Sequence, residues 1–180
     1  MQLVIVDRHG VINPESDRPV TPDHEWRAIP GSLEALTRLS GAGYRLVLAS
    51  NEPHLHRKNF DVESLISIHH RMQHDLLEAG AGLDAVFFCG CPPKRGCDCT
   101  MPKPGMLREI AERLRTSLGG VPVIGARMET IEAARAAGAR PILIGSGEGS
   151  KGASGVPDDL ERYDDLAAAV DSLLAESAQA

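Results

Sequence analysis

The chain repeats one pattern, a short run of apolar residues followed by a longer amphipathic segment. The apolar runs cover residues 3–6, 46–49, 85–88, 121–124 and 141–144. Each run is apolar along its whole length, which is typical of a strand buried on both faces of a parallel sheet. Because strands and helices alternate, the helices are expected to cover both faces of that sheet. We therefore predict an α/β fold with three layers, α/β/α.

The segments between the runs have the spacing of helices. Leucines recur at helical spacing after Ser32, which is a plausible N-cap, and Asp61 is expected to cap a longer helix. Further helices are predicted over residues 104–118, 129–137 and 163–177. Ligands of such folds bind at the carboxyl ends of the strands. The candidates for function therefore follow the runs, at residues 7–9, 50–51, 89–103 and 126–130.

Length and composition indicate one globular domain that spans residues 1–180. The formal net charge of -6 argues against nucleic-acid binding. No run approaches the roughly 18 apolar residues that cross a bilayer, and the N-terminal residues lack the basic and small-residue pattern of a signal peptide. We expect a cytoplasmic monomer that binds neither nucleic acid nor membrane.

All four cysteines lie in one short segment, as two C-x-C pairs formed by Cys89, Cys91, Cys97 and Cys99. Clustered thiols in a reducing compartment favour a metal over disulfides. Four thiolates complete the tetrahedral set of a structural Zn²⁺ site, which leaves no open position for a substrate. We predict a zinc loop at residues 89–99; two disulfides or four free thiols are the alternative.

Several segments resemble one family of phosphatases. Residues 7–13 read Asp-Arg-His-Gly-Val-Ile-Asn and are similar to the Asp-Arg-Asp-Gly-Val-Ile-Asn signature of haloacid-dehalogenase (HAD) phosphatases that remove the 7-phosphate from D-glycero-D-manno-heptose 1,7-bisphosphate. Histidinol-phosphate phosphatases are close relatives of these enzymes of lipopolysaccharide heptose synthesis. The resemblance implies a Rossmann-like HAD fold without a large cap, and a zinc loop after the third strand. It covers nearly the whole chain and includes residues 23–32, 68–72, 84–89, 102–107 and 133–138.

The resemblance also implies roles for individual residues. Asp7 stands at the position of the nucleophile, which forms an aspartyl-phosphate in the family. Ser50 and Asn51 stand at the pair that holds the phosphate. A lysine after the zinc loop neutralises charge in the family, and acidic residues after the fourth strand help to hold Mg²⁺. The family implies Mg²⁺ as a cofactor.

The chain departs from the family at five of these positions. His9 replaces the aspartate that acts as general acid and base, and Met101 replaces the lysine. Ala126 and Thr130 stand where the family has the two Mg²⁺-side aspartates, and Glu52 begins a segment that replaces Gln-Ser-Gly. We expect Mg²⁺ to bind weakly, because it prefers octahedral sets of oxygen ligands.

Three hypotheses for function follow. In the first, the chain is a pseudophosphatase without Mg²⁺-dependent activity. In the second, it is a metal-independent hydrolase with Asp7 as nucleophile, His9 as acid and base, and Lys103 or Arg127 as the source of positive charge. In the third, it binds a sugar phosphate without hydrolysis, through an anion site in which Arg8, Ser50, Asn51, Lys103 and Arg127 are the candidates.

Three further histidines, His69, His70 and His74, lie on or near one face of a predicted helix and could suggest a second metal site. We expect them to be solvated helix residues instead, because exposed histidines are far more common than ligands.

Overall fold

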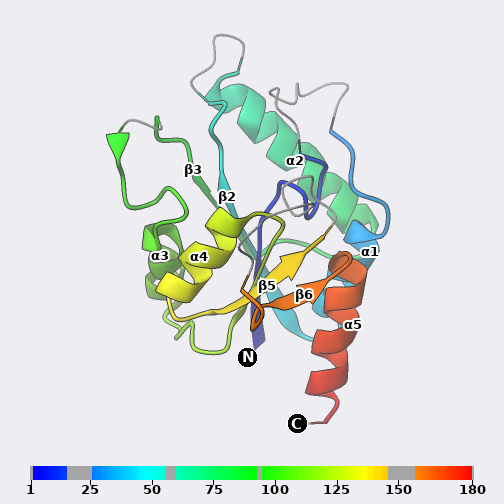
Figure 1. The fold of residues 1–180 in the computed structure, drawn as a ribbon. Coiled ribbons are helices and arrows are strands. Elements are labelled where there is room, and N and C mark those ends of the chain that lie inside the picture. Colours follow the sequence, from blue (N-terminus) through cyan, green and yellow to red (C-terminus); the bar gives the residue numbers. More distant parts are fainter. Residues whose placement is uncertain (1, 16–25, 56–59, 93–94, 146–156, 180) are drawn as a thin grey trace.

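Six parallel strands form one sheet at the centre of the protein (Figure 1). The computed structural model describes residues 2–15, 26–55, 60–92, 95–145 and 157–179. Within these residues the strands run in the order β3-β2-β1-β4-β5-β6, and every neighbouring pair is parallel. Their bounds are β1 Gln2–Val6, β2 Tyr44–Asn51, β3 Ala85–Cys89, β4 Pro122–Gly125, β5 Arg140–Ile144 and β6 Glu161–Tyr163.

Helices cover both faces of the sheet, as the sequence predicted (Figure 1). On one face α1 (Ser32–Gly41), α2 (Val62–Glu78) and α5 (Leu166–Ser177) pack on alternate strand residues such as Val4 and Leu46. On the other face α3 (Gly105–Leu114) and α4 (Met128–Ala136) pack on the residues that point the opposite way, including Ile5 and Val47. The predicted three-layer α/β/α fold is confirmed.

The order of the strands reverses at β1, because β2 lies on one side of it and β4 on the other. The connections therefore diverge at the carboxyl end of β1 and leave room there for a ligand. Asp7 follows β1 directly, and the ends of β2, β3 and β4 lie beside it.

The sequence analysis missed one strand and misplaced the ends of two helices. Tyr163 pairs with Ile144 in the short strand β6, so α5 begins at Leu166 rather than at residue 163. The side chain of Asp165 caps α5 by accepting a hydrogen bond from the N–H of Ala168 at 2.8 Å. Helix α3 ends at Leu114, four residues before the predicted end, because Arg115 turns into the left-handed region with φ 50°.

The starts of α1, α3 and α4 differ by one residue from the expectation, whereas α2 begins where it was predicted. Gly31, with φ 83°, is the N-cap of α1, and the hydroxyl of Ser32 donates instead to the carbonyl of Ile12 at 3.1 Å. Helix α4 begins at Met128 rather than at residue 129. Asp61 caps α2 as predicted, since its side chain accepts from the N–H of Ser64.

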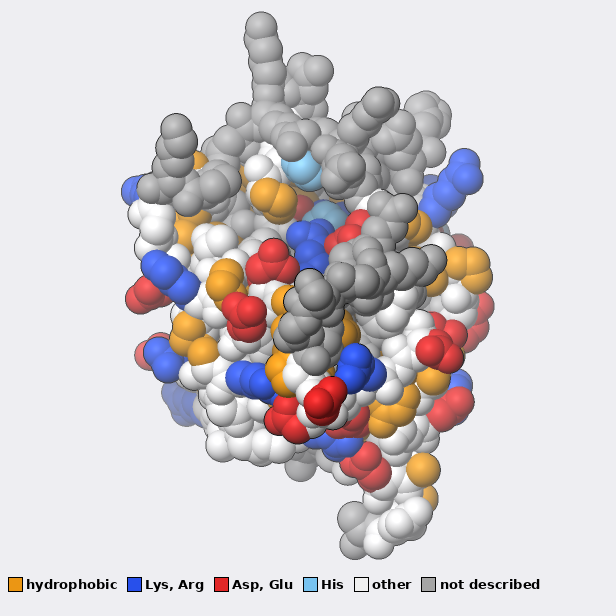
Figure 2. Space-filling view, in the orientation of Figure 1, with side chains coloured by type: hydrophobic (Ala, Val, Ile, Leu, Met, Phe, Trp, Pro, Cys, Tyr) orange, Lys and Arg blue, Asp and Glu red, His pale blue; other side chains and the backbone are white. Residues whose placement is uncertain are grey.

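Positive and negative side chains alternate over the face of the molecule shown in Figure 2. None of the helices in the described part of the chain is long and apolar enough to cross a membrane.

Candidate functional site

The carboxyl ends of β1 to β4 surround a cavity of about 190 Å³. A larger and more open hollow of about 340 Å³ lies at the opposite ends of the strands, but Arg140 in its wall is already paired with Glu161 and Glu176. The smaller cavity is lined by several residues that the sequence analysis selected as functional candidates. It is lined by Asp7, Asn51, Pro53, Cys89, Cys91, Thr100, Met101, Arg127, Glu129 and Thr130.

The Asp7 carboxylate lies at the inner end of this cavity and is 4% exposed. One of its oxygens, Oδ1, accepts a hydrogen bond from the N–H of Arg8 at 2.7 Å. The other, Oδ2, accepts from the hydroxyl of Thr130 at 2.8 Å. Burial raises the pKa of Asp7, although His9, Thr130 and Arg127 oppose the rise. Both oxygens of the predicted nucleophile are therefore engaged by the protein itself.

Thr130 reaches Asp7 because the backbone beside it carries no side chain. A Cβ atom on Gly125 would stand 2.6 Å from the Cβ of Thr130, so only glycine leaves room for this approach. The sequence analysis identified Thr130 only as the loss of an aspartate. The structure shows that it also supplies a hydrogen bond to the predicted nucleophile.

The donor set around Asp7 does not fit Mg²⁺. Ala126 offers only a methyl group, and the hydroxyl of Thr130 is directed to Asp7. In the described part of the chain, Asp7 belongs to no group of three His, Cys, Asp or Glu side chains whose ligand atoms lie together. Glu129 is the other carboxylate in the wall of the cavity, and it is exposed. Since Mg²⁺ demands near-octahedral oxygen coordination, a single buried carboxylate is a poor site for it.

Four polar side chains form a buried network behind the cavity wall. Arg8, His9, Ser50 and Glu52 are each at most 5% exposed. The guanidinium of Arg8 donates to both oxygens of Glu52, from Nε at 3.1 Å and from Nη2 at 2.6 Å. The hydroxyl of Ser50 donates to Oε1 of Glu52 at 2.5 Å. None of the four side chains is among those that line the cavity.

His9 belongs to this network. Its Nε2 lies 3.0 Å from Nη2 of Arg8 and 3.4 Å from Oε2 of Glu52. The other ring nitrogen, Nδ1, is buried and makes no hydrogen bond to the residues that the structure describes. The predicted acid and base is thus held beside an ion pair and does not face the cavity.

Glu52 keeps its negative charge inside the protein. Burial favours the neutral form, but the hydrogen bond from His9 and the charge of Arg8 outweigh it and hold the pKa of Glu52 well below its usual value of 4.5. The bidentate contact with Arg8 is the geometry in which an arginine binds a carboxylate most strongly. The network therefore contains a permanent anion at neutral pH.

Asn51 holds the segment that carries Met101. Its Nδ2 donates to the carbonyl of Met101 at 2.9 Å, and its Oδ1 accepts from the N–H of Met101 at 3.1 Å. The thioether of Met101 therefore lines the cavity where the family resemblance places a lysine. Lys103 points elsewhere: its Nζ donates to the carbonyl of Gly96 at 2.6 Å and lies 3.6 Å from Asp98. Lys103 does not line the cavity.

Arg127 is the side chain that brings a positive charge from the predicted anion site to the cavity, which Asn51 lines as well. It follows β4 and acts as the N-cap residue of α4, with an extended backbone. Its Nε donates to a carboxylate oxygen of Glu15, and its positive charge lowers the pKa of Asp7 against the larger effect of burial. An anion in the cavity would compete with Glu15 for this guanidinium.

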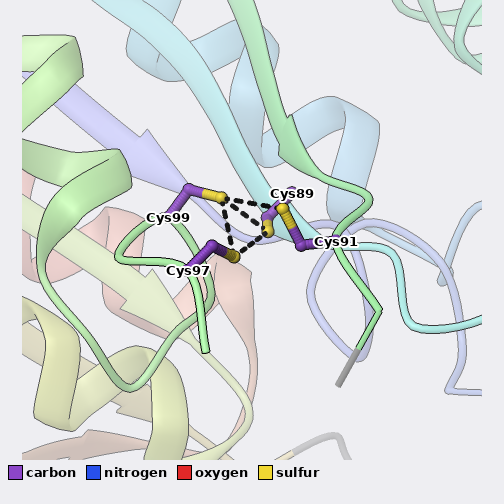
Figure 3. A group of neighbouring side chains, drawn as sticks. All are labelled: Cys89, Cys91, Cys97 and Cys99. Atoms are coloured by element: carbon purple, nitrogen blue, oxygen red, sulfur yellow. Dashed lines mark hydrogen bonds between the residues drawn. The ribbon is translucent and has the colours of Figure 1, made fainter. Parts of the chain in front are cut away.

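The four cysteines lie together at the edge of the same cavity (Figure 3). Cys89 and Cys91 come from the end of β3, and Cys97 and Cys99 come from the loop before α3. The sulfur atoms are free thiols at separations of 2.9–3.7 Å. Around a tetrahedral Zn²⁺ with bonds of about 2.3 Å, sulfur atoms stand about 3.8 Å apart. The cluster can hold one metal ion.

Thr100 extends this cluster on the side of the cavity. Its hydroxyl lies 3.1 Å from the sulfur of Cys89 and 2.9 Å from that of Cys97. Hydrogen bonds, the largest of them from Thr100, lower the pKa of Cys97 to about 6, whereas burial raises the pKa of Cys99. A thiolate at Cys97 near neutral pH provides a first ligand for a metal.

The expectation for His69 was wrong. His70 and His74 are exposed as expected, but His69 is 8% exposed and its ring packs against Phe88 with a centroid separation of 5.8 Å. Burial, together with the charge of Arg8, lowers the pKa of His69 to about 4. The signal was present in the sequence, because residue 69 follows the helical spacing of the buried positions 65, 72 and 76. The three histidines do not come together as a metal site among the described residues.

Sequence reasoning also missed the roles of Glu52 and Glu15. Glu52 was identified as a departure from the family but was given no partner, and Glu15 was not connected to Arg127. Both contacts join residues far apart in the chain, Arg8 with Glu52 and Arg127 with Glu15. A single sequence gives no signal for such pairs beyond the presence of opposite charges.

Comparison with known proteins gives consistent matches. The sequence model of the HAD-hydrolase-like family matches residues 99–175. The D-glycero-β-D-manno-heptose-1,7-bisphosphate 7-phosphatase of Bordetella bronchiseptica is 42% identical over 98% of this chain and 100% of its own length. The enzyme of the same name from Pseudomonas putida is 39% identical over 97% of this chain and 100% of its own length.

Solved structures give the same result. The crystal structure of the B. bronchiseptica D,D-heptose 1,7-bisphosphate phosphatase, complexed with magnesium and phosphate, has a TM-score of 0.92, with 43% identity over 98% of this chain and 99% of that one. The phosphatase of that name from Burkholderia thailandensis has a TM-score of 0.75, with 38% identity over 97% of this chain and 99% of that one.

Proposed function

This chain belongs to the family of D-glycero-β-D-manno-heptose-1,7-bisphosphate 7-phosphatases, and we propose that it is a pseudophosphatase within that family, without Mg²⁺-dependent phosphatase activity. One observation carries the proposal. Both oxygens of Asp7 are engaged, by the N–H of Arg8 and by the hydroxyl of Thr130, and Ala126 adds no carboxylate for a metal.

The chemical reason is electrostatic. A carboxylate that attacks a phosphate ester brings a negative charge toward a dianion, and a cation must offset this repulsion. Here Met101 replaces the lysine of the family and the Mg²⁺ donor set does not fit. Loss of one stabilising group of this kind lowers kcat by about 10²- to 10³-fold. Several losses together do not add strictly, but among the described residues Arg127 is the cation that remains in the wall of the cavity for this step.

The alternative of a metal-independent hydrolase requires His9 to exchange a proton with a substrate in the cavity. The ring does not line the cavity, and its Nε2 is directed to Arg8 and Glu52. This arrangement gives His9 a role in the buried network rather than in acid and base catalysis. We therefore prefer the pseudophosphatase.

The proposal includes a ligand, because Arg127 keeps a positive charge in the wall of the cavity. A sugar phosphate is the ligand that the family suggests, with its phosphate near Arg127 and its hydroxyl groups toward Glu129 at the cavity wall. We further propose that Cys89, Cys91, Cys97 and Cys99 bind a structural Zn²⁺. The protein is proposed to act as a monomer in the cytoplasm.

The test is an assay of phosphate release with Mg²⁺ from D-glycero-β-D-manno-heptose 1,7-bisphosphate and from an aryl phosphate. The B. bronchiseptica enzyme, prepared in the same way, serves as the active control. We expect no turnover above background from this chain, and also none from its Asp7→Asn variant. Turnover by the wild type that disappears in Asp7→Asn contradicts the proposal. The Tm of the wild type, measured with and without heptose phosphates, tests whether the protein binds a sugar phosphate, because a bound ligand raises the Tm.

A further inference from the structure

Glu52 places a negative charge directly behind the wall of the cavity. Its neighbours in the chain, Asn51 and Pro53, line the cavity, whereas Glu52 is 1% exposed and does not. Its carboxylate accepts from the hydroxyl of Ser50 at 2.5 Å and from Arg8 at 2.6 Å and 3.1 Å. Ser50 and Arg8 are residues that the sequence predicts to bind phosphate. In this structure both donate to a carboxylate of the protein.

We propose that the Glu52 carboxylate acts as a built-in anion, which holds the donors of Ser50 and Arg8 behind the cavity wall and thereby weakens the binding of a phosphate group in the adjacent cavity. The inference rests on the proposed function in one respect, namely that the cavity receives the phosphate of a sugar phosphate. It adds a residue that determines the affinity for this ligand.

The hydrogen-bonding capacity of Ser50 supports the inference. A serine hydroxyl carries one hydrogen, so it donates to one acceptor at a time. While that hydrogen is directed to Glu52, Ser50 presents only lone pairs to any other group, and lone pairs repel a phosphate oxygen. Arg8 donates to Glu52 from Nε and Nη2, and its Nη1 lies 3.4 Å from Oδ1 of Asn13. All three nitrogens of the Arg8 guanidinium therefore already have partners within the protein.

The charge of Glu52 adds a second effect in the same direction. The carboxylate remains ionised, because His9 and Arg8 stabilise it against the cost of burial. In the wild type this charge cancels the positive charge of Arg8, whose guanidinium lies 2.6 Å away, so the pair offers no net attraction to a phosphate dianion. Without the charge of Glu52, the guanidinium of Arg8 would attract the dianion through a medium of low dielectric constant, where the attraction is stronger than in water. Arg127 then remains as the cation at the cavity, and it must leave Glu15 to bind an anion.

Titration of inorganic phosphate into wild type and Glu52→Gln, followed by calorimetry, tests the inference. Glutamine keeps the size of the side chain, removes its charge and leaves one neutral acceptor in place of two charged oxygens, so it occupies fewer donors of Ser50 and Arg8. We expect Glu52→Gln to bind phosphate at least about tenfold more tightly, which is the effect of one charge-assisted hydrogen bond. Ser50→Ala added to Glu52→Gln should remove most of the gain, because the released hydroxyl is then absent.

Glu129→Gln is the matched control, because it removes one negative charge from the cavity wall without touching Ser50 or Arg8. An equal gain in Glu129→Gln would show a general effect of charge and overturn the inference. Affinity that is no tighter in Glu52→Gln than in the wild type overturns it as well. If Glu52→Gln does not fold, the double variant Arg8→Met/Glu52→Met replaces the whole ion pair by apolar side chains of similar size. It still releases the hydroxyl of Ser50 from Glu52, so it should also bind phosphate more tightly than the wild type, and an affinity equal to that of the wild type overturns the inference. These outcomes concern affinity, so they are separate from turnover, which tests the proposed function.

Discussion

Each polar residue selected from the sequence as a phosphate contact is held by another group of the protein. Ser50 and Arg8 donate to Glu52, Asn51 binds the backbone of Met101, and Arg127 is paired with Glu15. Any ligand must exchange these bonds for its own, so the net gain from each contact is small. At the scale of single residues, the site satisfies its own polar groups rather than those of a substrate.

The first prediction concerns the stability of the buried ion pair. Glu52→Gln leaves the positive charge of Arg8 buried beside a neutral side chain, and we expect the free energy of unfolding to fall by about 3–5 kcal/mol. Because the pKa of Glu52 is depressed in the folded protein, the carboxylate stabilises the fold above its ordinary pKa of 4.5. This stabilisation decreases as the pH falls below that value. Urea unfolding of both proteins between pH 7 and pH 3 measures the difference in their free energies of unfolding. This difference should become smaller as the pH falls.

The double variant His9→Asp/Glu52→Gln is the control for this prediction. It restores a carboxylate within reach of Arg8, since Nε2 of His9 is 3.0 Å from the guanidinium. We expect it to recover part of the lost stability at pH 7. A double variant as unstable as the sum of the two single variants would show that residues 9 and 52 are not coupled.

At the scale of helices and loops, α2 places a titratable group in the core. His69 shares its buried face with Leu65, Met72 and Leu76. The ring is neutral in the folded protein because burial lowers its pKa to about 4 from 6.5. An unfolded chain binds a proton at this histidine more readily, so folding becomes less favourable as the pH falls.

The second prediction follows from that difference. Between pH 6.5 and pH 4, His69 should decrease the free energy of unfolding by up to about 3 kcal/mol. A His69→Phe variant should lose this part of the pH dependence and become less sensitive to acid than the wild type. His74→Phe, at an exposed position of the same helix, is the matched control and should behave as the wild type does. Equal slopes for all three proteins would contradict the prediction.

The third prediction concerns the cysteine loop. We expect one Zn²⁺ per chain by elemental analysis of protein purified without chelator, and less than one in Cys97→Ser. Removal of the metal should lower the Tm by several degrees, because folding and metal binding are linked, and added Zn²⁺ should restore it. Titration of thiols in denaturant tests for disulfides, because two disulfides leave no free thiol, whereas a zinc site leaves all four of Cys89, Cys91, Cys97 and Cys99. The zinc content then distinguishes a zinc site from four free thiols.

The sequence was sufficient for elements that have a strong local signal. The apolar runs predicted five of the six strands, and the side chain of Asp61 caps α2 as expected. Strand β6 was missed because Glu161–Tyr163 is short and polar and becomes a strand only by pairing with β5. The site shows the same limit. Asp7, Asn51 and Arg127 meet in the cavity because each lies at or just after the end of a strand, but the partners of Arg8 and Arg127 depend on tertiary contacts.

At the scale of the whole molecule, the scaffold agrees with that of a relative named as a phosphatase, whereas the family resemblance implies other residues at the reacting positions. The TM-score of 0.92 to the magnesium- and phosphate-bound B. bronchiseptica phosphatase covers 98% of this chain. The sheet still brings the ends of β1 to β4 together, and Asp7 still follows β1. The proposed loss of activity therefore rests on side chains at the ends of the strands and not on a change of fold.

The last prediction concerns the catalytic and metal positions at which this chain departs from the family. Introducing His9→Asp, Met101→Lys, Ala126→Asp and Thr130→Asp returns the four catalytic and metal positions to the residues of the family. We expect this fourfold variant alone to be poorly stable, because a carboxylate at position 9 would lie close to Glu52, whose Oε2 is 3.4 Å from the present His9 ring. Adding Glu52→Gln removes the repulsion while Arg8 keeps one carboxylate partner.

The fivefold variant should therefore gain Mg²⁺-dependent release of phosphate from the heptose bisphosphate. The gain should vanish on Asp7→Asn and on removal of Mg²⁺ by chelation. The fourfold variant, assayed in parallel, should be less active because its unpaired buried carboxylate destabilises the same network. A folded fivefold variant that binds Mg²⁺ and phosphate but releases no product would contradict the prediction. It would mean that these five positions do not account for the proposed loss of phosphatase activity, and that residues behind them have changed as well.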